Sequence, residues 1–119
     1  MITFVTPPPG LTSRHFDLLR EEGADGVYTL ASRDEPGVSL LVVDPSRWVP
    51  DYRPDIPSGA LEPLGELDTD PLVLVTAAVS DRKVRLNLMA PMVVNPSAAS
   101  AVQVIVEGQQ VRDLELCPS

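Results

Sequence analysis

The apolar residues of this chain fall in short runs, and prolines or turn residues end almost every run. The sequence contains 13 prolines in 119 residues, and proline can neither donate to a strand ladder nor continue a helix. No alternation of strands with helices of about 10–15 residues is visible. The spacing therefore favours an all-β fold over a parallel α/β fold.

Alternating or continuous apolar patterns predict about seven to nine short strands. Residues 72–79 form the strongest run, which we expect to be the central strand. Residues 84–88 alternate cleanly, and Pro91 predicts a bend or bulge after them. The other strand candidates are residues 2–5, 26–31, 38–43, 102–106 and 111–116, together with residues 15–20 as either a strand or a helical turn.

One segment is a helix candidate. Ser58 is a plausible N-cap for a helix over residues 59–64, although the segment is short and contains Pro63. The predicted fold class is therefore a small antiparallel β-barrel or sandwich of short strands with at most one short helix. Because no linker precedes the apolar run that follows Pro71, we expect residues 1–119 to form a single domain.

The net charge of −8 is confined to the first part of the chain. Residues 1–70 contain 13 acidic and 5 basic residues, whereas residues 71–119 contain 4 of each. Direct binding of nucleic acid needs clustered Lys and Arg to neutralise phosphates, so the charge argues against it. An acidic surface instead favours a basic protein partner.

Most catalytic and membrane functions find no support in the sequence. No apolar run approaches the roughly 18 residues of a membrane span, and the start lacks a signal-peptide pattern. We therefore expect a cytoplasmic protein without membrane contact. His15 and Cys117 are the single histidine and cysteine, so we predict no catalytic residues, metal or cofactor. A small hydrolase that uses two converging carboxylates is the remaining enzymatic alternative.

A proline-rich loop after the strand candidate at residues 38–43 carries the first set of candidate functional residues. The loop presents Trp48 and Tyr52, and aromatic residues held on a stiff loop are typical of binding surfaces. The alternative is that both aromatics are core residues that close one end of a small barrel. Asp44 before Pro45 is best explained as the cap of an Asp-Pro turn.

Residues 84–95 form the second informative segment. Their alternation predicts a strand that bends at Pro91. Asn87 and Asn95 lie on either side of this bend, where their side chains could satisfy backbone groups that the broken ladder leaves unpaired. A role in recognition is the alternative.

Five segments occur along the chain in the order LVVDP, VPDY, LVLVTAAVS, VRLNLMAPMVVN and QVIV. Segments of this kind in this order resemble the flagellar assembly factor FliW family, and the resemblance covers roughly residues 2–106. The chain departs from the family pattern at several places: the strand that usually precedes Ile2 is missing, Leu11 replaces a Phe, Ala101 replaces a Gly, and the basic tail is absent.

The resemblance implies a non-enzymatic regulator made of one FliW-like domain, residues 1–119. Members of the family bind flagellin and also bind CsrA, a small RNA-binding repressor of flagellin translation, and the two partners compete. We expect the acidic first 70 residues to provide much of the CsrA-binding face, and a sheet edge or rigid groove to hold extended flagellin segments. A monomer is the default expectation, and another β-barrel interaction module is the alternative. The candidate partner-binding residues are Trp48, Asp51, Tyr52, Asp55, Glu62 and Glu66.

Overall fold

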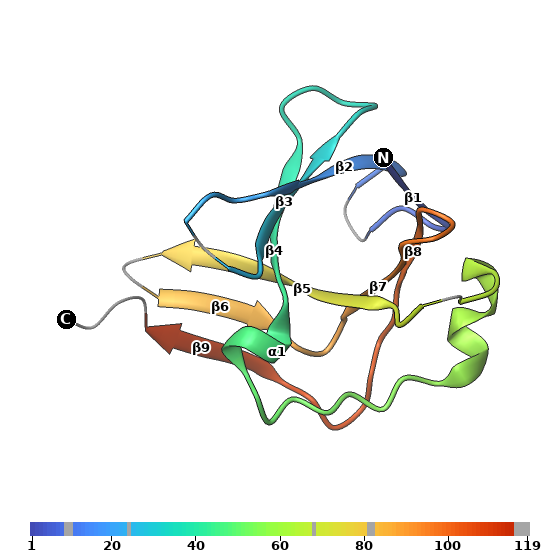
Figure 1. The fold of residues 1–119 in the computed structure, drawn as a ribbon. Helices are drawn as coiled ribbons and strands as arrows, with labels where there is room; N and C mark the ends of the chain where they lie inside the picture. The colour runs from blue at the N-terminus through green and yellow to red at the C-terminus, as the bar shows by residue number, and fades with distance from the viewer. Residues whose placement is uncertain (9–10, 24, 68, 81–82, 116–119) are drawn as a thin grey trace.

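The computed structural model describes residues 1–8, 11–23, 25–67, 69–80 and 83–115. In these residues nine strands form one sheet in the order β4-β3-β2-β1-β8-β7-β5-β6-β9, and β4 also pairs with β5. This additional pairing closes the seven strands from β4 to β5 into a barrel (Figure 1). The predicted all-β fold class is confirmed. The strands are β1 (Ile2–Phe4), β2 (His15–Arg20), β3 (Val27–Ser32), β4 (Ser39–Val43), β5 (Leu72–Ser80), β6 (Lys83–Asn87), β7 (Met92–Asn95), β8 (Ser100–Gln103) and β9 (Val111–Glu115).

One ladder of the barrel departs from the predicted antiparallel arrangement. β1 and β8 run parallel, with Thr3 opposite Ser100, whereas the other pairings around the barrel are antiparallel. A parallel pair needs a long connection rather than a hairpin, and almost the whole chain separates these two strands. The local alternation of side chains carries no sign of such a distant pairing.

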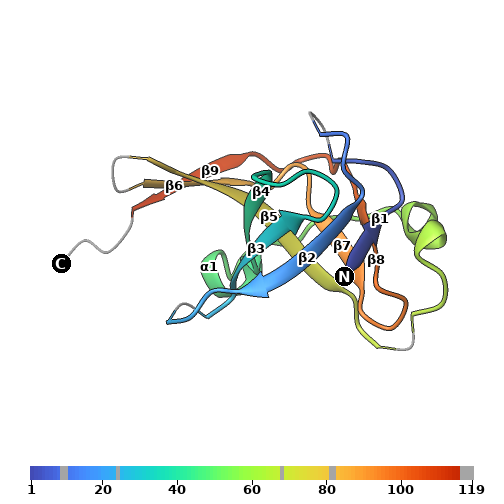
Figure 2. The same cartoon turned by 90° about the horizontal axis from the view of Figure 1, so that it is seen from above.

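β5 is the central strand, as its apolar run predicted, because it pairs with β4, β6 and β7. Its first half belongs to the barrel. Its last residues, 77–80, pair with β6, and β6 pairs with β9. These three segments project from the barrel (Figures 1 and 2) and are termed the extension from here on.

The chain bulges between β6 and β7, where Pro91 predicted a bend. The four residues of β5 from Leu74 to Ala77 lie opposite seven residues of the other chain segment, from Leu86 to Met92. The three additional residues leave the ladder with β5, so the bulge marks the point where the extension departs from the barrel.

The segment after β8 follows this bulge on its other side. The N–H groups of Val104 and Val106 donate to the carbonyl oxygens of Pro91 and Met89 at 2.9 and 2.8 Å. β8 therefore ends at Gln103 rather than reaching residue 106 as predicted. Val104 and Val106 are nevertheless buried, as their alternation indicated.

Three groups of buried side chains fill the molecule. The barrel interior contains Phe4, Phe16 and Leu74 among others, and the two phenylalanine rings meet edge to face with their centres 5.4 Å apart. A second group lies between the extension and residues 48–52. A third group lies around Leu64 and Val93.

Two short helical segments lie between β4 and β5: α1 (Pro45–Trp48) and the 3₁₀-helix η1 (Ser58–Leu64). η1 corresponds to the predicted helix, but Pro57 rather than Ser58 occupies its N-cap position, and no side chain caps it. Pro63 has no N–H with which to extend an α-helical ladder, and so short a segment cannot compensate for the loss. α1 was not predicted, because it is a single turn between prolines.

Candidate partner-binding surfaces

The long connection from β4 to β5 wraps around one side of the molecule (Figure 1). Residues 49–66 of this connection are termed the acidic segment. They carry the four acidic candidates from the sequence and one basic residue, Arg53. The acidic candidates are Asp51, Asp55, Glu62 and Glu66.

The start of the acidic segment is fixed by α1. Asp44 occupies the N-cap position, and its Oδ1 accepts hydrogen bonds from Ser46 N at 3.0 Å and from Ser46 Oγ at 2.7 Å. Pro45 is buried at the first helical position, where its missing N–H does no harm. The N–H of Asp44 donates to the carbonyl oxygen of Gly26 at 2.7 Å. Asp44 and Pro45 thus hold the segment against the turn between β2 and β3.

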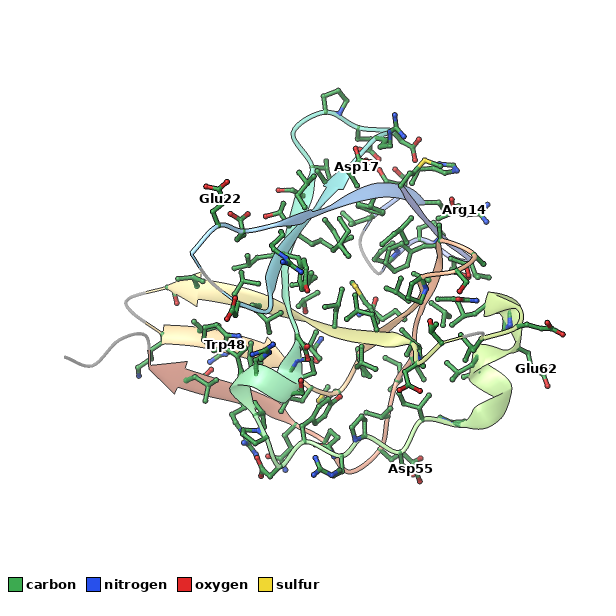
Figure 3. All side chains as sticks on the ribbon, in the orientation of Figure 1. Arg14, Asp17, Glu22, Trp48, Asp55 and Glu62 are labelled. Atoms are coloured by element: carbon green, nitrogen blue, oxygen red, sulfur yellow. The ribbon has the colours of Figure 1, made fainter. Side chains whose placement is uncertain are left out.

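The two aromatic candidates are placed differently from one another. Trp48 is half-buried and packs against the buried group beneath the extension (Figure 3). Tyr52 is only 8% exposed, and its hydroxyl donates to the carbonyl oxygen of Leu88 at 2.7 Å. Burial raises the pKa of Tyr52 to about 12. Of the two interpretations of Tyr52, the structure supports the core residue, because a buried hydroxyl needs such a partner.

The four acidic candidates are all exposed. Figure 3 shows Asp55 and Glu62 pointing outward from the side of the molecule that the acidic segment covers. Asp51 differs from the others because Nη1 of Arg112 on β9 donates to its Oδ1 at 3.3 Å. This hydrogen bond holds the pKa of the Asp51 carboxyl below its usual value. The acidic segment therefore presents carboxylates to solvent, and one of them, that of Asp51, is also paired with the extension.

The end of the acidic segment is fixed by Asn95, which is fully buried at the end of β7. Its Nδ2 donates to the carbonyl oxygens of Leu64 at 2.9 Å and Glu66 at 3.0 Å. Its Oδ1 accepts from the N–H of Ser97 at 3.1 Å. One amide thus satisfies three backbone groups and holds the segment on the barrel.

Asn87 and Pro91, which the sequence analysis singled out together with Asn95, lie at the bulge. Oδ1 of Asn87 accepts from the N–H of Met89 at 3.2 Å, and Pro91 is buried with its carbonyl oxygen bonded to Val104. Both asparagines of the motif therefore bind backbone groups, which agrees with the structural interpretation of this segment.

The extension has a second surface that the sequence reasoning missed. Val84 and Leu86 point to the face that Tyr52 covers, so the alternate residues of β6 point to the opposite face. This opposite, open face holds a groove of about 590 Å³. The groove lining includes Ala78, Arg85, Asn87, Met89, Ile105 and Val111.

Three large apolar side chains among the described lining residues are exposed: Met89 by 41%, Ile105 by 71% and Val111 by 44%. Clustered apolar exposure of this kind is typical of binding surfaces. The sequence feature that indicates this surface is Ile105, an apolar residue that faces outward because it lies between the inward-facing Val104 and Val106. Without the tertiary structure nothing showed that Met89 and Val111 lie beside it.

The described residues contain no group of three or more His, Cys, Asp or Glu side chains placed to hold a metal ion. His15 Nδ1 lies 3.2 Å from Oδ2 of Asp34 on the surface, and a hydrogen bond from this ring holds the pKa of Asp34 below its usual value. Cys117 lies outside the described residues. Within the described part of the chain, no helix has the length and apolar character to cross a membrane.

A small β-barrel with an exposed acidic segment and an apolar groove has the architecture of a protein-interaction module. The sequence profile of the family described as "FliW protein" matches residues 1–113. The chain therefore belongs to the FliW family, which confirms the resemblance noted in its sequence.

Individual relatives agree with this membership. The flagellar assembly factor FliW of Syntrophotalea carbinolica is 30% identical over 108 residues, which cover 89% of this chain and 77% of that protein. The Treponema pallidum protein of the same name is 37% identical over 86 residues, 70% of this chain but only 57% of that protein. A crystal structure of the flagellar assembly factor FliW matches with a TM-score of 0.83 and 27% identity, covering 99% of this chain and 86% of that chain.

Proposed function

We propose that residues 1–119 act as one non-enzymatic, cytoplasmic FliW-like unit that binds a CsrA-type repressor and flagellin in alternation. When flagellin is scarce, the protein binds the repressor and flagellin translation proceeds. When flagellin accumulates, it occupies the protein and releases the repressor. Family membership and the name flagellar assembly factor, which the relatives carry, support this proposal.

The observation that carries the repressor half of this proposal is the exposed acidic segment. Its carboxylates project to solvent, while Tyr52 and Asn95 hold its backbone on the body of the protein. A repressor that binds RNA needs a basic surface. Exposed carboxylates on a segment that is held in place attract such a surface and repel RNA from it.

The test is charge reversal within the acidic segment, compared with a matched reversal elsewhere. The variant Asp55→Lys, Glu62→Lys, Glu66→Lys leaves the Asp51–Arg112 contact intact. The control Glu22→Lys, Asp25→Lys, Glu107→Lys changes the net charge by the same amount at other exposed positions.

Calorimetric titration with purified CsrA at low salt measures the effect. We expect the segment variant to bind at least about tenfold more weakly, and the control to stay within about threefold of the wild type. The wild-type affinity should also fall with added salt, because exposed charges are screened. Unchanged affinity of the segment variant at low salt would overturn this assignment.

Competition tests the switch itself. Wild-type protein saturated with CsrA is titrated with purified flagellin, and the released CsrA is measured by size-exclusion chromatography. Release of CsrA in proportion to bound flagellin is expected. Failure of the wild-type protein to bind either partner would contradict the proposed function and leave a β-barrel interaction module with other partners.

A further inference from the structure

The groove on the open face of the extension differs in charge from the rest of this acidic protein. Among the residues that line it, Arg85 is the single charged one. Its guanidinium binds the carboxylate of Asp113 on the neighbouring strand through two hydrogen bonds, 2.8 Å to Oδ1 and 3.3 Å to Oδ2. The described residues that line the groove thus include no carboxylate to attract a basic partner, and they combine apolar side chains with the amides of Asn87 and Gln103.

The groove lining also includes Gln103, one of whose amide atoms has no hydrogen-bond partner among the described residues. Nε2 of Gln103 donates to the carbonyl oxygen of Ala90 at 3.0 Å, which fixes the orientation of the amide. Oε1 of Gln103 is buried without a hydrogen-bond partner among the described residues. A buried acceptor in this state costs free energy.

We propose that flagellin docks in this groove through an apolar segment, on the face of the extension opposite to the acidic segment. This inference rests on the proposed function, in which flagellin is a partner, and adds the surface that it uses. A volume of about 590 Å³ accommodates several side chains of a peptide. Met89 adapts its shape readily to an incoming side chain, because methionine is unbranched and flexible.

The acidic segment and the groove differ in charge and therefore suit different partners. The repressor is basic and is attracted to the carboxylates of the acidic segment. A segment that is apolar finds its complement in the groove, where Met89, Ile105 and Val111 are exposed to water in the free protein. Covering these side chains removes apolar area from water, which favours binding.

The test replaces two exposed side chains of the groove by carboxylates. Met89→Asp together with Ile105→Asp introduces charge into the apolar lining without emptying a buried site. Leu19→Asp together with Val79→Asp is the matched control, because both residues are exposed apolar residues outside the groove lining. Circular dichroism and thermal melting confirm that both double variants fold.

We expect M89D/I105D to bind flagellin at least about tenfold more weakly than the wild type, and CsrA within about threefold of it. The control should bind both partners as the wild type does. If the wild type binds flagellin and M89D/I105D binds it equally well, the groove assignment is overturned while the proposed function stands. If M89D/I105D lowers the affinities for flagellin and for CsrA by the same factor, the groove assignment is also overturned. If the wild type does not bind flagellin, the proposed function fails, and this inference fails with it.

The milder variant Ile105→Ala tests the apolar contact without introducing a charge. It shortens the most exposed apolar side chain of the groove and is expected to weaken flagellin binding by a smaller factor, in the same direction. No change with Ile105→Ala, combined with a loss in M89D/I105D that added salt reverses, would show an electrostatic effect and contradict the apolar contact.

Discussion

The extension has two faces that differ in almost every respect although the same strands form both. On one face, Val84 and Leu86 are buried beneath Val49 and Tyr52. On the other face, Met89 and its apolar neighbours are exposed in an open groove. The alternation of side chains along a strand produces this division. A sheet of three strands can therefore support an acidic segment on one side and present an apolar surface on the other.

The two faces are also connected. The hydroxyl of Tyr52 binds the carbonyl oxygen of Leu88, and the next residue, Met89, lines the groove. Arg112 on β9 binds Asp51 of the acidic segment. These contacts connect the two surfaces directly, so that binding at one surface can change the affinity of the other. Under the proposed function, competition between the partners would then require no shared surface.

The largest expected difference between the faces is in stability. Leu86→Ala removes a fully buried side chain from the covered face and should lower the free energy of unfolding by about 2–5 kcal/mol. Met89→Ala on the open face should lower it by less than about 1 kcal/mol, because the side chain is already partly in water. Urea denaturation measures both values. Similar losses would show that the open face is packed as tightly as the covered one.

The two asparagines of the 84–95 segment provide the next comparison. Asn95→Asp removes the Nδ2 donor from the carbonyl oxygens of Leu64 and Glu66 and should cost about 2 kcal/mol of folding free energy. Asn87→Asp keeps the oxygen that accepts from Met89, so its expected cost is below about 0.5 kcal/mol. Chemical denaturation of the two variants gives the comparison. Equal costs would contradict the role of Asn95 in holding the acidic segment.

Tyr52→Phe should lower the free energy of unfolding by about 1 kcal/mol, because it leaves the carbonyl oxygen of Leu88 without its donor. The pKa of Tyr52 is raised from 10.0 to about 12, so the folded state favours the neutral phenol. This contribution is fully present below pH 10 and is lost as the pH rises through 12. Wild-type stability should therefore fall toward that of Tyr52→Phe in alkali. If the unfolding free energies of the two proteins change in parallel between pH 9 and 12, this role of the Tyr52 hydroxyl is contradicted.

The smallest expected effect is at acid pH and involves the exposed ion pairs. Hydrogen bonds from Arg112 and Arg85 hold the pKa values of Asp51 and Asp113 below their usual value of 3.8. A lowered pKa contributes stability above pH 3.8, which is lost as the pH falls through the folded-state value. Carboxyl NMR titrations should show the Asp51 pKa rising in Arg112→Gln and the Asp113 pKa rising in Arg85→Gln. Unchanged values would exclude these pairs in solution.

The features that sequence predicted correctly are those with a local cause. β5 and β6 were found because a continuous apolar run and an alternating run depend on residues close in the chain. The exposure of Glu62 and Glu66 followed from the cost of burying charge. The bulge was found because Pro91 interrupts a strand pattern.

The features that were missed or left open depend on distant residues. The parallel pairing of β1 with β8 joins opposite ends of the chain. The position of Tyr52 could not be decided without the carbonyl oxygen of Leu88, which lies 36 residues away. The groove escaped notice because Leu40 of the barrel and Val111 of the extension line it together. The local pattern of apolar and polar residues carries no information about contacts between residues that are far apart in the chain.

The central claim is that the two partners bind opposite faces of the extension. Isotope-labelled protein titrated separately with CsrA and with flagellin tests this claim through the backbone amide resonances of each residue. CsrA should shift the resonances of Asp55, Glu62 and Glu66 most strongly, and flagellin those of Met89 and Ile105. If both partners shift the same set of resonances most strongly, they share one surface, and the two-face account is contradicted.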